Sequence, residues 1–196
     1  MGGIAGTCCR SGSHDPMSTT SSGGTAPQKT PDLWVNIDPE LKFHDPRPLE
    51  LLDYWNAKRG PRAMPSRAEV DPVELKAHLG SLVLIDVEHD PFRLRYRLIG
   101  EKITGAMARD NTGRYYDEIY SEPLLDSIYK SFEWILAHKA PLRSYGEAFY
   151  PDKNHYRYEI INLPLSDDGE VVNMVLGELI FTPTSSLEGE APGADG

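Results

Sequence analysis

The sequence predicts an α+β domain in which one antiparallel sheet packs against helices. Three observations favour this class: a strictly alternating segment at 91–100, a long amphipathic segment at 122–141, and a run of strand-like segments after it. The chain has 196 residues, and its middle of roughly 140 residues is long enough to bury one core without disulfides or metal. We therefore expect a single domain over residues 43–183.

Both ends of the chain are rich in Gly, Ser, Thr, Pro and Ala and hold few residues that can fill a core. We expect residues 1–42 to be a disordered tail that ends in an irregular lead-in, because prolines interrupt any long helix there. Residues 184–196 are expected to be a second disordered tail. Met17 is an alternative to Met1 as the true start.

Residues 48–60 predict the first helix, with Leu51, Leu52 and Trp55 on adjoining helical positions and a stop at Gly60. This helix either covers the open face of the sheet or pairs with a second copy, and we favour covering. Its three apolar residues are also candidate partner or dimer contacts.

A short second helix is expected after Asp71, because Asp71-Pro72 followed by Glu74 resembles a helix start. Apolar residues then follow at helical spacing: Leu75, Leu79 and Leu82.

Residues 82–88 and 92–99 predict a hairpin around a turn at Asp90-Pro91. The second strand places four apolar residues on one face, namely Phe92, Leu94, Tyr96 and Leu98. The arginines at 93, 95 and 97 lie on the other face, where they could hold an anion, pair with acidic residues such as Glu159 and Glu178, or simply be solvated.

Short helices and loops are expected over residues 101–120, and such a segment could border a ligand. The longest helix follows within 122–141, with one apolar stripe formed by Leu125, Ile128, Phe132, Ile135 and Leu136. Trp134 lies nearly opposite this stripe. It either packs against the N-terminal helix or contacts a subunit or partner, where exposed Trp is enriched.

Three strands are expected at 142–150, 155–165 and 170–181, with turns at Pro151-Asp152 and 166–169. The last strand is apolar on both faces, which predicts a central place in the sheet with both faces covered. Apolar positions in the middle strand change parity, so we expect a bulge or bend near Ile160.

This order of elements resembles the PAS fold, and several strings resemble a family of mostly single-domain bacterial PAS-like proteins over about Leu49–Phe181. The strings are DYWNAKRG, MPSRAEVDP, LVLIDVE, RYRLIGE, RDNTGR and PLSDDGEVVNMVLGEL. Departures are KAHLGS at 76–81, which lacks the expected prolines, and Ala108, where a Gly usually stands. The resemblance implies a five-stranded antiparallel sheet in order 2-1-5-4-3, helices on one face and an N-terminal helical extension.

Composition and charge limit the partners. The net charge is −10 and the basic residues are scattered, so we expect no nucleic-acid binding. No apolar stretch reaches the length of a membrane span. Both cysteines, Cys8 and Cys9, lie in the N-terminal tail, which fits a reducing, cytoplasmic location.

The sequence shows no catalytic motif and no cluster of metal ligands, so we expect neither a catalytic nor a metal site. Haem-binding PAS domains take an axial histidine from the long helix, but here His138 points away from the apolar stripe, which disfavours haem. A flavin that forms a cysteinyl adduct is disfavoured because the expected domain contains no cysteine. The cofactor stays unknown, and noncovalent flavin remains open.

A pocket between the sheet and the long helix would be lined by Tyr96, Tyr145 and Tyr158, with Ile103 and Met107 from the short-helix segment. The alternative is that these side chains simply fill the core.

The resemblance implies sensing or partner binding. We therefore predict a non-enzymatic signalling module that docks to another protein, with homodimerisation and switching by a small ligand left open. One alternative is a small α+β-pocket enzyme of isomerase or dehydratase type, with Glu147 and His155 directed into the pocket. The other is a ligand-free structural adaptor.

Overall fold

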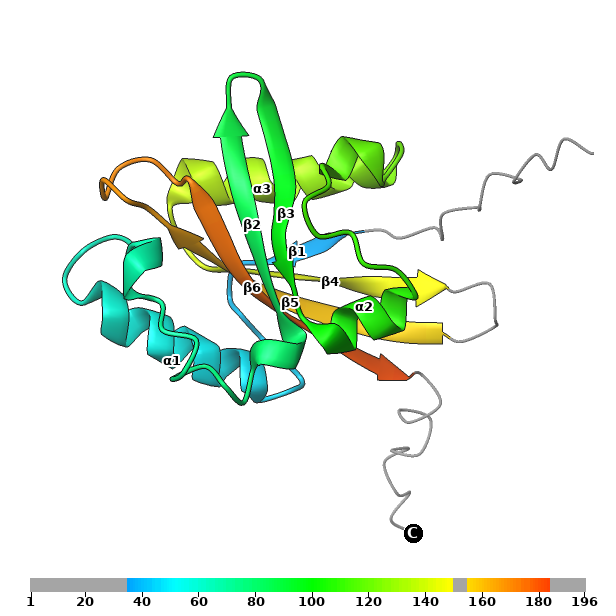
Figure 1. The fold of residues 1–196 in the computed structure, drawn as a ribbon, viewed down its shortest axis with the longest axis horizontal. Coiled ribbons are helices and arrows are strands. Elements are labelled where there is room, and N and C mark those ends of the chain that lie inside the picture. The colour runs from blue at the N-terminus through cyan, green and yellow to red at the C-terminus, as the bar shows by residue number, and fades with distance from the viewer. Residues whose placement is uncertain (1–34, 150–154, 184–196) are drawn as a thin grey trace, which may run out of the picture.

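The chain folds around a six-stranded antiparallel sheet in a computed structural model that describes residues 35–149 and 155–183 (Figure 1). The strand order is β1-β4-β5-β6-β2-β3. The predicted class and the order of the five long strands are confirmed. The predicted count of five strands was wrong, because β1 (Asn36–Asp38) in the expected irregular lead-in pairs with β4 and extends the sheet.

The five long strands form two units of the sheet. One is the hairpin of β2 (Leu82–His89) and β3 (Phe92–Ile99), which the sequence predicted. The other is the run of β4 (Leu142–Phe149), β5 (His155–Leu165) and β6 (Met174–Pro183). Strand β6 joins the units because it pairs with both β5 and β2, which confirms its predicted central place.

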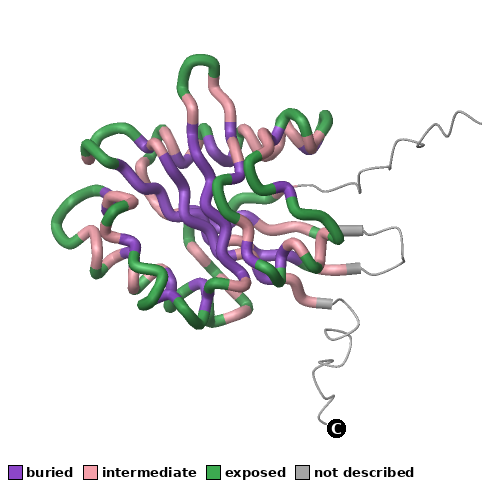
Figure 2. The backbone as a smooth tube through the Cα atoms, viewed as in Figure 1, coloured by how far each residue is buried: buried purple, intermediate pink, exposed green. Residues whose placement is uncertain are grey.

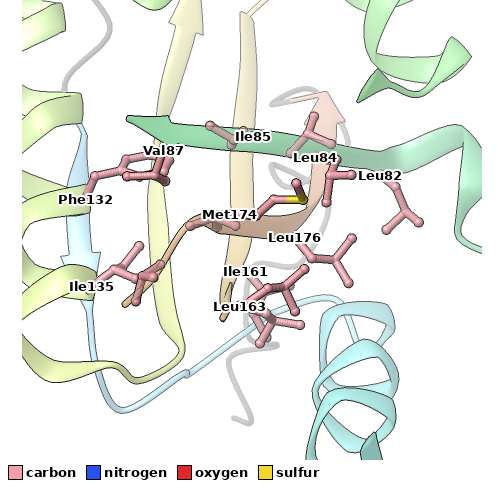
Figure 3. Close-up of a cluster of buried hydrophobic side chains, with 14 of the residues drawn as sticks. Leu82, Leu84, Ile85, Val87, Phe132, Ile135, Ile161, Leu163, Met174 and Leu176 are labelled. Carbon is pink, nitrogen blue, oxygen red and sulfur yellow. The ribbon is translucent and has the colours of Figure 1, made fainter. Parts of the chain in front are cut away.

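Both faces of the sheet are covered, and each face has its own helix. Side chains of cross-strand partners share a face, so the register of the strands assigns each side chain either to the face that packs against α3 or to the face that packs against α1. Figure 3 shows Phe132 and Ile135 of α3 (Leu124–His138) beside Val87, while Leu163 and Leu176 face α1 (Arg47–Arg59). The buried backbone of Figure 2 accordingly follows the central strands.

Helix α1 begins after Pro46 and ends at Gly60, close to the predicted bounds. Leu51 and Trp55 are 0% and 3% exposed, and the Trp55 indole Nε1–H donates a 2.9 Å hydrogen bond to the Pro164 carbonyl of β5. The helix therefore covers the α1 face through an apolar contact with one fixed hydrogen bond.

The predicted second helix after Asp71 was wrong. The chain instead makes a 3-10 helix η1 (Arg67–Glu69), consecutive turns at 72–78 and a 3-10 helix η2 (Leu79–Ser81). The N–H of Leu75 donates to the Asp71 carbonyl four residues back, but the next hydrogen bonds span three residues, from the N–H of His78 to Leu75 and from Ser81 to His78. This tighter winding accompanies the burial of the His78 side chain against the sheet.

The predicted bulge near Ile160 was also wrong. Register between β4 and β5 is unbroken, and Tyr158 lies on the α3 face while Ile161 and Leu163 lie on the α1 face. Because both faces are covered, apolar residues of either parity are buried, and no bend is needed to reconcile them.

The bulge lies in the β2–β3 hairpin instead. The register shifts between Leu84 and Ile85, whose partners are Leu98 and Tyr96, so Arg97 is the extra residue. The predicted alternation therefore fails at Leu98, which lies on the α1 face and is 43% exposed.

The connection from β3 to α3 contains α2 (Glu101–Met107) and a 3-10 helix η3 (Tyr116–Glu118), as the expected short helices. Gly113 has a positive φ of 83° in the loop between them, where a side chain would be strained. Within residues 35–149 and 155–183, no helix has the length and apolar character that a membrane crossing requires.

Candidate functional site

The space between β3 and α3 holds a layer of aromatic side chains, which we call the tyrosine layer: Tyr96, Tyr116, Tyr120 and Phe132. The rings of Tyr96 and Tyr116 have centroids 4.3 Å apart, and Tyr116 meets Tyr120 edge-on at 5.5 Å. The hydroxyl oxygens of Tyr96 and Tyr120 are 2.9 Å apart and share a hydrogen bond. Burial raises the pKa of Tyr116 well above its ordinary value. Each ring of the layer therefore contacts another ring of the layer, and the buried Tyr116 hydroxyl stays neutral.

Of the five predicted pocket residues, Tyr96 lies in this layer. Ile103 of α2 is buried, and Met107 is half-buried against the same hydrophobic core. Tyr158 lies on the α3 face of β5, directly opposite Phe181 of β6. Burial raises the pKa of the Tyr158 hydroxyl. Tyr96, Ile103 and Met107 thus belong to one hydrophobic core, while Tyr158 lies on the α3 face of β5.

Tyr145 does not join them. Its register partner on β5 is Glu159, so it lies on the α1 face, opposite the tyrosine layer. There its ring packs under the Arg143 guanidinium, 4.1 Å from the ring centroid. The sequence placed all three tyrosines on one pocket wall because residue types alone do not reveal the parity of a strand.

Asn111 is a polar residue of this region that the sequence analysis missed. It is 2% exposed, and its side-chain Oδ1 accepts no hydrogen bond in the part of the chain that the structure describes. Backbone hydrogen bonds from Gly113 to Tyr96 and from Tyr96 to Arg114 fasten its loop to β3. Ala108, where the resemblance leads us to expect Gly, begins this loop with a φ of 51°.

The α1 face carries buried charges. Arg143 of β4 donates from Nε and Nη2 to Glu159 Oε1 of β5, at 3.0 and 2.5 Å. Asp38 of β1 accepts from Arg143 Nη1 at 3.2 Å, and the backbone N–H of His44 donates to the Glu159 carboxylate. Residues that precede α1 are thus tied to the sheet through charged groups.

A second buried pair joins His78 to Glu178 of β6. His78 Nδ1 lies 3.0 Å from each carboxylate oxygen of Glu178, and both side chains are buried. Burial raises the pKa of Glu178, against the lowering effect of its hydrogen bond with His78. From the sequence, Glu178 was considered as a partner for the β3 arginines, and nothing there indicated contact with His78.

The three arginines of β3 are paired with carboxylates. Arg95 Nη2 donates to Asp86 Oδ2 at 2.8 Å, and Arg97 lies 3.5 Å from the same carboxylate. Arg93 binds Asp117 with two hydrogen bonds, of 2.9 and 2.7 Å. Acidic pairing is thus found for all three, although the partners are not the predicted Glu159 and Glu178.

The predicted interface residues fall into two groups. Leu51 and Trp55 lie in the core of this chain, and Leu52 is half-buried against it, so the first two face no partner while α1 covers the sheet. Trp134 is half-buried on α3, where its ring stacks on His138 with centroids 4.1 Å apart. Trp134 is therefore the member of the set with access to solvent on the long helix.

Two of the groups considered for cofactors and catalysis, His138 and Glu147, lie outside the tyrosine layer. His138 is exposed, and its Nδ1 bonds the Trp134 carbonyl at 2.8 Å. Glu147 is exposed, and its register partner Arg157 lies on the α1 face with it, so Glu147 does not point into a pocket. The side chain of His155 and both cysteines lie outside the described residues. No group of three potential metal ligands occurs within the described ranges.

Comparison with known proteins identifies the fold. The profile of the PAS domain family matches residues 44–180. A search of curated proteins found no match. Among solved structures, that of an RNA-binding light-oxygen-voltage receptor matches at 12% identity with a TM-score of 0.46. The match covers 76% of this chain and 39% of that receptor, and at this TM-score it supports no inference about ligands or RNA. The family match spans most of the chain, which therefore belongs to the PAS domain family.

Proposed function

We propose that this PAS domain, a sensor and signalling module, acts without catalysis by docking to another protein. The observation that supports docking is the tyrosine layer, in which the chain's own rings and hydroxyls contact one another where a PAS ligand would lie. If the chain's own side chains occupy this space, the signal does not depend on a bound ligand. The domain then acts through contacts of its surface with another protein. The cytoplasmic location and the lack of nucleic-acid binding belong to this proposal, as does a domain that ends near residue 183 and begins at β1, ahead of the expected boundary at 43.

The proposed contact surface is the outer side of α3 around Trp134. Trp134 and His138 form a flat stacked pair, with 14° between their planes, and His138 is exposed beside it. Aromatic residues are enriched among the side chains that contribute most to protein–protein binding. Either a partner protein or a second copy of the chain would contact this pair.

The experiment compares the wild-type chain with Trp134→Ala in quantitative pull-down from its own cells and in light scattering after size exclusion. We expect Trp134→Ala to remove a specific partner or to dissociate a dimer, because truncating such an anchor costs about 2 kcal/mol or more. Val73→Ala is the matched control, since Val73 is apolar and 75% exposed elsewhere on the surface. Equal binding by all three chains would overturn the proposal.

A small ligand that switches docking is the second candidate, and Asn111 is the observation that favours it. A buried acceptor without a partner is uncommon and is normally satisfied by water or a ligand. The ligand would contact Asn111 together with side chains that line the layer: Tyr96, Ile103, Met107 and Tyr158. Titration with candidate ligands, followed by tyrosine chemical shifts in wild type and Asn111→Leu, tests it; unchanged shifts in wild type would reject it.

A further inference from the structure

The His78–Glu178 pair joins the N-terminal segment to the middle of the sheet. Glu178 is 1% exposed and His78 is 9% exposed. The cross-strand partners of Glu178 are apolar, Leu82 on β2 and Ile161 on β5, as are its neighbours on the same face of β6. The pair therefore lies in surroundings where an unbalanced charge is poorly solvated.

Among the described residues, two charged groups besides His78 act on Glu178. Arg47 and Asp45, at the start of α1, act on Glu178, and they bind each other with Arg47 Nη2 2.6 Å from Asp45 Oδ2. The remaining ring nitrogen of His78, Nε2, lies 3.8 Å from Glu50, whose side chain is 66% exposed. Arg47 and Asp45 largely cancel, and solvent screens Glu50. The charge balance at the site is therefore set by how many protons His78 and Glu178 carry together.

One shared proton leaves the pair neutral overall, whether as imidazolium and carboxylate or as imidazole and carboxylic acid. Loss of that proton leaves a buried carboxylate, and a second proton leaves a buried imidazolium. In water an imidazole has a pKa of about 6.5 and a glutamate about 4.3. When the segment that carries His78 is detached from the sheet, both side chains are in water. They then hold one proton between them at mildly acid pH and lose it as the pH rises.

We propose that the His78–Glu178 contact is a proton-linked latch, which holds α1 and the segment to Ser81 on the sheet while the pair carries one proton. The latch loosens as the pH rises and that proton is lost. This inference goes beyond the proposed function, because it concerns how the α1 face is covered and not what binds at α3. The raised pKa of Glu178 agrees in sign, since a group with a raised pKa contributes stability below its ordinary pKa and loses it as pH rises.

Hydrogen exchange of backbone amides tests the latch, with exchange rates corrected for the intrinsic rate at each pH. Amides of α1 report undocking of the segment, and those of β5 report global unfolding as an internal reference. Between about pH 6.5 and 8, we expect α1 protection to fall by up to about tenfold per pH unit, the slope for one linked proton. Global unfolding also breaks the pair, so the same linked proton contributes to the β5 slope, and α1 must exchange faster than β5 for its amides to report undocking of the segment.

Glu178→Gln keeps the size of the side chain and removes its charge. In this variant the fall of α1 protection with rising pH should disappear or reverse, because loss of the proton no longer leaves a buried carboxylate. Glu74→Gln is the matched control, since it removes the exposed Lys58–Glu74 pair of the same segment and should keep the wild-type response. The test depends on how steeply α1 protection changes with pH and not on its absolute value. A variant that is less stable overall therefore remains informative. A flat wild-type profile, an unchanged slope in Glu178→Gln, or α1 protection equal to that of β5 at every pH would overturn the latch.

Discussion

The two faces of the sheet are covered in different ways. On the α3 face, Tyr96 and Tyr116 meet ring to ring and Tyr96 bonds the hydroxyl of Tyr120, with no charged group in the contact. On the α1 face, apolar burial of Trp55 is combined with charged pairs such as Arg143–Glu159 and His78–Glu178.

This difference predicts different failure modes. Loss of an aromatic ring leaves a cavity whose cost depends on lost contacts alone. Loss of one member of a buried ion pair leaves an uncompensated charge, although replacement of both members by apolar residues is often tolerated. The α1 face should therefore respond to pH and charge, and the α3 face to volume.

The largest effect is expected on the α3 face. Phe132→Ala removes a ring that is 4% exposed and meets Tyr116 edge-on, so we expect a loss of about 3–5 kcal/mol in the free energy of unfolding. Denaturant titration measures it, with Phe132→Leu as control at less than about 1.5 kcal/mol. Equal losses for the two variants would show that volume does not dominate this face.

A comparable loss is expected for a single change on the α1 face. Arg143→Met leaves Glu159 buried without its cation and should cost about 3–5 kcal/mol. The double variant Arg143→Met/Glu159→Leu should recover most of that loss in the same titration, because the most deeply buried charges of the cluster are gone and the remaining Asp38 carboxylate is partly exposed. A double variant that is less stable than the single one would contradict the claim that unpaired buried charge determines the stability of the α1 face.

The hydroxyl contact of the tyrosine layer has a smaller expected effect. Tyr96→Phe keeps the ring and removes one partner of the 2.9 Å contact with Tyr120, which should cost about 0.5–1.5 kcal/mol. The cost should be independent of pH between about 5 and 8, because no group of the layer titrates there. If the loss in the free energy of unfolding changed with pH in this range, a group of the tyrosine layer would have to be ionised there.

The smallest effect concerns the turn between β5 and β6. Asp168 accepts from the backbone N–H groups of Glu170 and Val171 and from Ser166 Oγ, which lowers the pKa of Asp168 to about 2. A lowered pKa stabilises the fold above the ordinary value of 3.8 and ceases to do so as pH falls toward 2. Wild type should exceed Asp168→Asn in thermal stability at neutral pH and lose that advantage in acid. A constant difference at all pH values would contradict this.

The sequence predicted those parts of the fold that depend on local pattern. Periodicity located α1 and α3, the apolar composition of β6 predicted its central place, and turn residues such as Gly169 marked the hairpins. These features follow from residues close together in the chain, which is why a single sequence carries them.

Features that depend on partners far apart in the chain were missed. The bulge at Arg97 reverses the face of Leu98, and the true parity of β4 places Tyr145 on the α1 face, so two sequence-based placements failed. Arg143 and Glu178 appeared as ordinary polar strand positions. Their burial follows from contact with Asp38 and His78, about 100 residues away.

The central claim is that the chain's own rings occupy the α3 face and that the domain acts by docking. Native mass spectrometry of protein purified from its own cells, compared with the denatured mass of the same sample, tests it most directly. We predict a native mass equal to that of one or two bare chains, or of a chain with a protein partner. A reproducible small extra mass that disappears on denaturation, and is lost in Asn111→Leu, would contradict the claim and establish a ligand beside the tyrosine layer.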